Sequence, residues 1–116
     1  MPDTSVQRFK LALAGRDALQ PLLAQLAATF TAADPAQLIA LSGPVLSPPD
    51  RAVFDPDLAT FNLAVFRQGL AAGTEGWVED DLAFVAPWRV ELGGVRVPVA
   101  VWHGEQDLGV PATHSR

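Results

Sequence analysis

The chain has 116 residues, a length that fits one domain, and carries a formal net charge of −5 from 8 basic and 13 acidic residues. This balance excludes a basic patch for nucleic acid and an electrostatic grip on anionic membranes. Hydrophobic residues make up 49% and charged residues 18%, which excludes general disorder, and the absence of cysteine excludes disulfide scaffolds, thiol catalysis and zinc sites built on cysteine.

Apolar spacing predicts helices over the first three-quarters of the chain. A short helix is expected over 5–14, and a longer one over 17–31, where leucines recur at the three- and four-residue spacing of one helical face. Asp34 and Pro35 start a third helix that ends near Leu41. The acid can cap free N–H groups there, and proline suits the first turn of a helix.

The same start signal returns twice further along the chain. Ser47 precedes two prolines and begins a short helical turn. Asp55 precedes a proline and opens the helix over 56–72, which Gly73 ends. A last short helix is expected over 75–85. These segments predict a mostly α-helical chain with about five short helices.

The composition changes after Pro87. Residues 97–102 carry no charge and are rich in β-branched side chains, a pattern typical of a strand buried on both faces of a parallel sheet. We predict one β-strand near 96–102. No other segment is a convincing strand, since 88–92 is short and is followed by two glycines. We therefore expect a second copy or a larger protein to provide its neighbour.

An acidic residue follows this predicted strand. Functional residues of open α/β sheets lie just past the carboxyl ends of strands, and Asp107 comes five residues after Trp102. The alternative is a structural role, in which Asp107 only caps a turn. His103 lies near Asp107 in the sequence, and we favour local packing or hydrogen bonding over catalysis for this side chain.

Both histidines of the sequence lie near the end of the chain. With two acidic residues they form one candidate set of metal ligands: His103, Glu105, Asp107 and His114. Their spacing matches no strong zinc motif, so we predict no metal site and no cofactor. We expect His114 to start a further helix and to face solvent rather than to act in catalysis.

The predicted strand and its loop carry a resemblance to a known family. Residues 97–107 read VPVAVWHGEQD, and with 110–111 and His114 they resemble the late strand and acid loop of α/β-hydrolase-fold enzymes. Three upstream stretches resemble the helical cap of a bacterial group of such hydrolases: 46–53, 76–81 and 87–88. The resemblance implies a partial α/β-hydrolase fold, with 1–86 as the helical cap region and 87–116 as the core strand and acid loop of an incomplete domain.

The resemblance also implies a reaction. It implies hydrolysis of a small apolar ester-like substrate by a Ser-His-Asp triad, in which Asp107 accepts a hydrogen bond from the imidazole and stabilises the imidazolium. The cap helices would cover the substrate pocket, with Trp77 and Phe84 as candidates to line it. A place in the hydrophobic core is the alternative for these aromatic residues.

The other two members of such a triad are not found in the sequence. The nucleophile elbow reads G-x-S-x-G, and none of the serines has glycine two residues away on both sides: Ser5, Ser42, Ser47 and Ser115. The family places the elbow upstream of Met1 and the base histidine beyond a further strand and helix. We therefore expect a fragment that is inactive alone, with a small-molecule substrate bound only by the full-length parent.

A different class of function is also open. The chain can instead be a non-catalytic helical interaction module that dimerises through its apolar face and the unpaired strand, and we expect the isolated chain to self-associate. The start of the chain has Asp3 and no apolar core of signal-peptide length. The longest apolar stretch, 18–33, is too short and interrupted to cross a membrane, so we expect a cytoplasmic protein.

Overall fold

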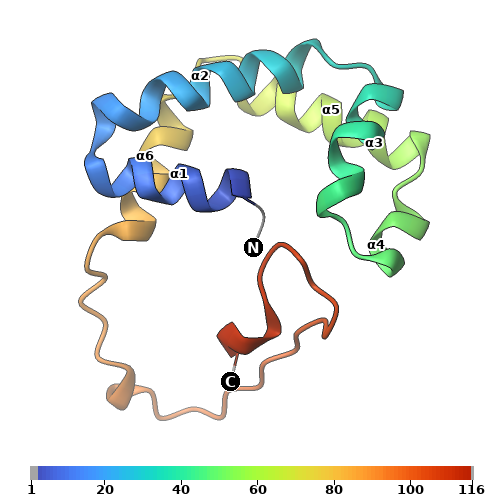
Figure 1. The fold of residues 1–116 in the computed structure, drawn as a ribbon. Helices are drawn as coiled ribbons and strands as arrows, with labels where there is room; N and C mark the ends of the chain where they lie inside the picture. Colours follow the sequence, from blue (N-terminus) through green and yellow to red (C-terminus); the bar gives the residue numbers. More distant parts are fainter. Residues whose placement is uncertain (1–2, 116) are drawn as a thin grey trace.

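A computed structural model describes residues 3–115 of the chain (Figure 1). Within these residues lie six α-helices, one more than the number expected: α1 (Asp3–Ala14), α2 (Arg16–Ala32), α3 (Pro35–Ser42), α4 (Pro48–Val53), α5 (Pro56–Gly69) and α6 (Glu75–Val85). Three short 3₁₀ turns are also present: η1 (Gly43–Val45) between α3 and α4, and η2 (Leu92–Gly94) and η3 (Ala112–Ser115) after α6. No described helix is long and apolar enough to cross a membrane.

The helix starts predicted from capping residues are confirmed. The carboxylate of Asp34 accepts the N–H of Gln37 at 2.8 Å, and the Gln37 side chain accepts the N–H of Asp34 at 2.8 Å, which completes a capping box. Ser47 and Asp55 cap α4 and α5 by accepting the N–H groups of Asp50 and Leu58, and each is followed by proline in the first turn. Local signals alone therefore place three of the helix starts.

The end of α5 comes earlier than predicted. The helix stops at Gly69 rather than at residue 72, because glycine is a weak helix former and the chain turns over 70–73. Gly73 lies in this turn with φ of 106°, a conformation that favours glycine. The turn joins α5 to α6, and both helices pack against α2.

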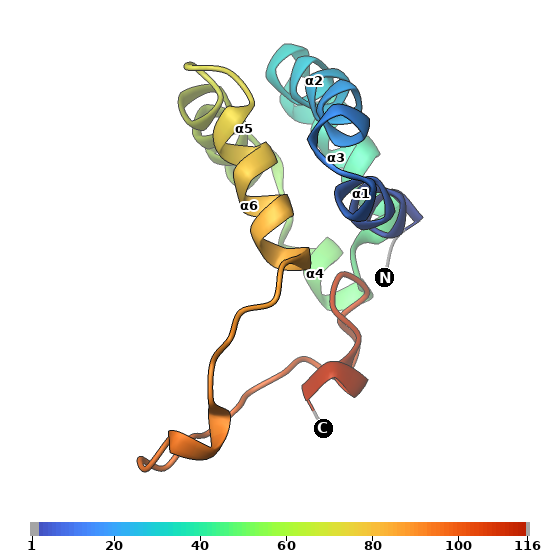
Figure 2. The same ribbon diagram turned by 90° about the vertical axis from the view of Figure 1, so that its left-hand side faces the viewer.

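The helices form two layers, with α5 and α6 on one side and α1, α2 and α3 on the other (Figure 2). The long helix α2 spans two separate hydrophobic clusters. One joins α1, α2 and α6 and has four buried residues: Ala12, Leu19, Leu23 and Val78. The other lies between α3, α5 and the end of α2 and again has four: Ala33, Leu38, Ala59 and Leu63. Each buried leucine contributes about 1.5–3 kcal/mol relative to an exposed one.

A polar contact ties the end of α2 to α5. Arg67 of α5 donates from Nε to the carbonyl of Thr31 at 3.0 Å and from Nη2 to the carbonyl of Ala33 at 2.9 Å. Carbonyl groups at a helix C-terminus have no partner within the helix, and a cation also suits the negative end of the helix dipole. Beside this contact, the rings of Phe30 and Phe66 stack with centroids 5.2 Å apart.

The predicted β-strand near 96–102 is wrong, and so is the partial α/β-hydrolase fold built on it. No strand occurs among residues 3–115, and residues 95–102 form an irregular segment with exposed side chains. A strand needs a neighbour for its backbone N–H and C=O groups. The one nearby candidate, 88–92, leads into the turn η2, where Gly94 donates to Glu91 within the same segment. The described part of the chain therefore consists of α-helices up to Val85, followed by an irregular C-terminal part.

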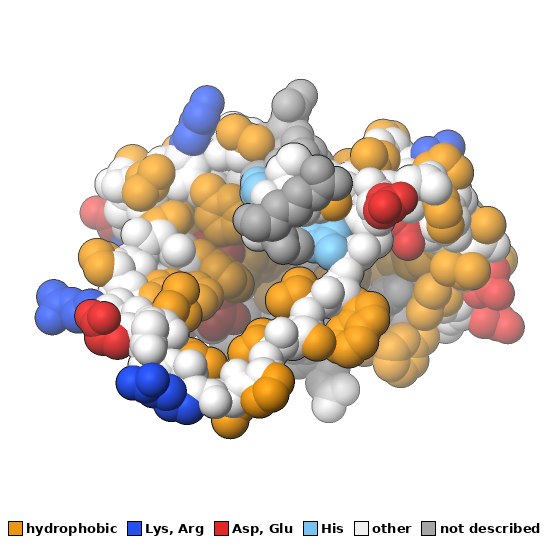
Figure 3. Space-filling model, turned by 90° about the horizontal axis from the view of Figure 1, so that it is seen from below, with side chains coloured by type: hydrophobic (Ala, Val, Ile, Leu, Met, Phe, Trp, Pro, Cys, Tyr) orange, Lys and Arg blue, Asp and Glu red, His pale blue; other side chains and the backbone are white. Residues whose placement is uncertain are grey.

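We name three regions of the molecule: the helical body (residues 3–85), the arm (residues 86–102) and the acid loop (residues 103–111). The arm begins at the end of α6 and extends away from the body. It then turns back, so that the acid loop lies near α4 (Figures 1 and 2). Seen from below, hydrophobic side chains occur at intervals along the arm, with charged side chains between some of them (Figure 3). The division into a cap region, 1–86, and a second part, 87–116, stays a prediction.

Candidate functional site

Asp107 organises the acid loop through one of its carboxylate oxygens. Oδ1 accepts the N–H of Gly109 at 2.8 Å and the N–H of Val110 at 2.9 Å. The N–H of Asp107 itself donates to the carbonyl of Gly104 at 3.1 Å, which closes a tight turn before it. A Cβ atom at position 109 would lie 3.3 Å from Oδ1, so glycine gives the carboxylate room to approach.

These bonds stabilise the ionised form of Asp107. The hydrogen bond from Val110 lowers the pKa of the Asp107 carboxyl, partial burial opposes this effect, and the bond from Gly109 and the nearby His103 lower the pKa further. The side chain is 40% exposed. Asp107 is therefore ionised at neutral pH, and within the described residues its second oxygen, Oδ2, accepts no hydrogen bond. The turn-capping role expected as an alternative uses only Oδ1.

His103 is bonded within the acid loop. Its Nε2 lies 2.7 Å from the carbonyl oxygen of Val110 and 3.6 Å from Oδ2 of Asp107, and its side chain is 17% exposed. A carbonyl oxygen only accepts hydrogen bonds. Nε2 therefore carries the hydrogen and donates the bond to the carbonyl of Val110. This geometry matches the local hydrogen-bonding role expected for His103 rather than the role of a catalytic base.

The predicted absence of a metal site stays a prediction, but the four candidate ligands do not form a cluster. No group of three or more metal-ligating side chains occurs in the part of the chain that the structure describes. His114 lies in the turn η3 with its side chain exposed, and its N–H donates to the carbonyl of Pro111.

A polar hollow of about 470 Å³ separates the acid loop from the start of α4. Its walls are Ser47, Pro49 and Asp50 on one side and residues 104–107 on the other. Ser47 is buried and donates to Asp50 at 2.5 Å, so its hydroxyl serves the cap of α4. This neighbour of Asp107 could not be predicted from the sequence, because more than fifty residues separate the two walls and only the fold brings them together.

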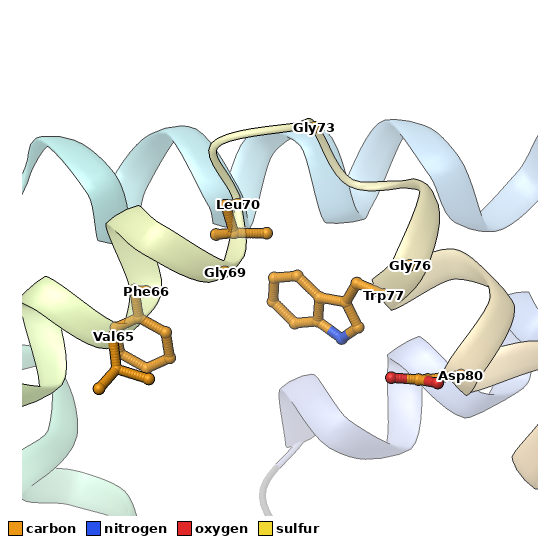
Figure 4. A pocket seen from close by; sticks show the side chains of 8 residues that line it. All are labelled: Val65, Phe66, Gly69, Leu70, Gly73, Gly76, Trp77 and Asp80. Carbon is orange, nitrogen blue, oxygen red and sulfur yellow. The ribbon is translucent and has the colours of Figure 1, made fainter.

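Trp77 lines an apolar hollow of about 380 Å³ between α5 and α6 (Figure 4). Its indole faces the side chains of Val65, Phe66 and Leu70, with Asp80 at the edge. The packing alternative is also observed in part, since Trp77 is half-buried against the cluster of α1, α2 and α6. One side chain thus joins the hydrophobic core and the wall of a hollow.

Phe84, the second cap candidate, lies elsewhere. Its ring packs against Phe9 and Trp88, with centroids 6.1 Å and 6.2 Å away, and it lines a separate hollow with Asp80 and Ala83. The structure therefore does not bring Trp77 and Phe84 into one hollow. Neither of these two hollows includes Asp107 among its lining residues.

A buried ion pair near Trp77 was likewise not predicted from the sequence. Arg8 Nε lies 2.9 Å from Oδ2 of Asp81, whose side chain is 2% exposed, and neither atom makes a hydrogen bond within residues 3–115. Burial raises the pKa of Asp81 because its desolvation outweighs the attraction of Arg8. A signal was present in the sequence: Asp81 lies three residues after Val78, on the face that α6 turns to the core.

Comparisons of the chain with models of protein families, with curated proteins and with solved structures found no match.

Proposed function

We propose that this chain provides the cap and the acid of a Ser-His-Asp hydrolase that cleaves a small apolar ester-like substrate, with Asp107 as the acid. The resemblance of its residues to α/β-hydrolase-fold enzymes supports the proposal. The observation that carries it is the geometry of Asp107, in which two backbone N–H groups fix one carboxylate oxygen, while the other accepts no hydrogen bond from the residues that the structure describes.

A triad acid must be charged, oriented and accessible to an imidazole. It accepts the N–H of the base histidine, keeps the ring in one tautomer and stabilises the imidazolium that forms during the reaction. Asp107 meets these needs with a lowered pKa, two orienting hydrogen bonds and a partly exposed side chain.

The rest of the triad comes from residues outside this sequence. No G-x-S-x-G occurs in the 116 residues, so the serine that attacks the ester carbonyl belongs to another part of the enzyme. A base histidine removes the serine proton and later gives it to the leaving alcohol, and water then hydrolyses the acyl-serine intermediate. Asp107 stays ionised throughout. The apolar hollow at Trp77 supports a substrate with an apolar group.

The proposal is tested on two proteins. The chain of 116 residues alone is expected to show no turnover of a p-nitrophenyl acyl ester. The native gene product that contains it is expected to hydrolyse the ester, and Asp107→Asn should lower kcat about 10⁴-fold. His114→Gln is the matched control, because His114 is exposed and should change kcat little. Turnover that persists in the Asp107→Asn protein overturns the proposal.

The exposed arm favours a second candidate, a non-catalytic module that self-associates. Val97, Val99 and Val101 are 69%, 70% and 67% exposed, and Trp102 is 88% exposed. Exposed apolar surface of this kind is typical of interaction sites. The neighbouring coding sequence separates the candidates. A G-x-S-x-G upstream and a Gly-His downstream support the hydrolase, whereas a discrete dimer of the chain with neither motif supports the module.

A further inference from the structure

We propose that His103 is the positioning residue of the acid loop, which holds Asp107 in the orientation that a triad requires. The proposal rests on the proposed function for its catalytic consequence. Its structural part stands on the hydrogen bonds of the loop alone, and the two parts are tested separately.

Val110 connects the two side chains. Its N–H donates to Oδ1 of Asp107 at 2.9 Å, and its carbonyl accepts the Nε2 proton of His103 at 2.7 Å. Both backbone groups of this one residue are therefore held by side chains of the loop. A change in the bond to His103 will change where the N–H of Val110 points, and so where Oδ1 of Asp107 rests.

The sequence after Val110 strengthens this connection. Val110 precedes Pro111, and a residue before proline is restricted to extended conformations. In extended backbone the N–H and C=O groups of one residue point to the same side, as they do in a hydrogen-bonded pair of strands. Val110 can therefore face His103 and Asp107 at once, and the acid loop is closed by side-chain bonds in place of a sheet.

The bond has the correct donor in either charge state of the imidazole. Neutral His103 with its proton on Nε2 donates to the carbonyl of Val110, and the protonated ring donates from the same atom. The His103 side chain is only partly exposed to solvent. Glutamine can place an amide donor at a similar distance from the backbone, whereas phenylalanine keeps a ring and loses the donor.

The structural test is an NMR titration of the chain, at a concentration where it is monomeric. In the wild type, the amide protons of Gly109 and Val110 are expected to follow the ionisation of Asp107, because both donate to its carboxylate. In His103→Phe this response should be lost and the pKa of Asp107 should rise toward its ordinary value. His103→Gln should keep the response, and His114→Gln, an exposed control, should leave it unchanged.

Two results would overturn the proposal. One is an unchanged response of Gly109 and Val110 in His103→Phe, and the other is a glutamine variant that is as damaged as the phenylalanine variant. If His103→Phe does not show the native amide spectrum of the helical body, the test rests on His103→Gln alone. A wild-type response of Gly109 and Val110 in His103→Gln then supports the positioning role. A lost response, in a variant whose helical body is folded, overturns the proposal.

The catalytic consequence is measured in the native gene product that contains the chain. His103→Phe is expected to lower kcat about tenfold with KM nearly unchanged, since a misplaced catalytic group slows the chemical step, and His103→Gln should restore most of kcat. A phenylalanine variant with unchanged kcat overturns the positioning role. If Asp107→Asn keeps full activity while the NMR response still depends on His103, the hydrolase proposal fails and the structural part stands.

Discussion

Large apolar side chains are buried in the core of the helical body and exposed in the arm. Leu19, Leu23 and Leu63 are at most 2% exposed in the body. In the arm, all large apolar residues are about half exposed or more: Trp88, Val90, Leu92, Val95, Val97, Val99, Val101 and Trp102. Hydrophobicity alone therefore does not decide burial in this chain.

The difference comes from where the backbone hydrogen bonds are made. A helix satisfies its own N–H and C=O groups, so α2 can bury one face against any neighbour that offers an apolar stripe. An extended segment cannot do so and needs a second strand. The arm has apolar side chains without such a partner in residues 3–115, whereas the acid loop uses Asp107 and His103 as partners for its own backbone.

The test with the largest expected effect shortens a leucine to alanine in each of the two regions. Leu23→Ala in α2 is expected to lower the free energy of unfolding by about 3 kcal/mol, because it leaves a cavity in a closely packed cluster. Leu92→Ala in the arm should change it by less than about 0.5 kcal/mol, since that side chain is largely exposed. Urea unfolding followed by circular dichroism measures both. Equal losses would show that the arm is packed in solution.

The part of the fold that sequence predicts well is the part with local causes. Asp34, Ser47 and Asp55 each act on N–H groups within three residues, so their helix starts could be read without knowing any tertiary neighbour. The strand near 96–102 was predicted from side chains, but its existence depends on a partner far away in the chain or outside it. That dependence explains why the same reasoning failed there.

In the candidate site, too, the features with local causes could be predicted, and those that depend on tertiary packing could not. The turn around Asp107 has local causes, because Gly109 and Val110 lie within three residues of it. The hollow beside Ser47 and the separate positions of Trp77 and Phe84 depend on how helices pack, which periodicity does not specify.

A second test compares two arginines. Arg67→Met removes two hydrogen bonds to the C-terminal carbonyls of α2 and is expected to lower the free energy of unfolding by about 1.5 kcal/mol. Arg96→Met makes the same change in the arm, where the described residues offer no hydrogen bond to Arg96, and should change stability by less than about 0.5 kcal/mol. Thermal unfolding of the two variants gives the comparison. An arm variant as unstable as Arg67→Met would contradict the separation of body and arm.

A third test uses pH to examine the buried charge of the body. The pKa of Asp81 is raised in the folded state, so the stability from this group is fully present below the ordinary aspartate pKa of about 3.9 and is lost as pH rises through the folded value. Asp81→Asn does not titrate at this position. The variant is therefore expected to lose more stability relative to the wild type near pH 4 than near pH 7. The opposite trend, measured by urea unfolding at both pH values, would mean that attraction to Arg8 outweighs burial.

The smallest expected effect on stability belongs to Val99, yet it bears most directly on what the arm does. Val99→Lys should change the free energy of unfolding by less than about 0.5 kcal/mol, because the side chain is 70% exposed. If the arm is the surface through which the chain self-associates, the same variant should shift the sedimentation of a concentrated sample toward the monomer, since a lysine charge is costly to bury between apolar surfaces.

Leu13→Lys is the matched control for Val99→Lys, because Leu13 is 72% exposed and lies at the end of α1, where a cation suits the helix dipole. An arm contact predicts that Leu13→Lys associates like the wild type. If Leu13→Lys dissociates the sample and Val99→Lys does not, the contact lies on the helical body. The exposed valines of the arm would then need another partner, and the hydrolase proposal supplies one, because the rest of that enzyme would have to cover them.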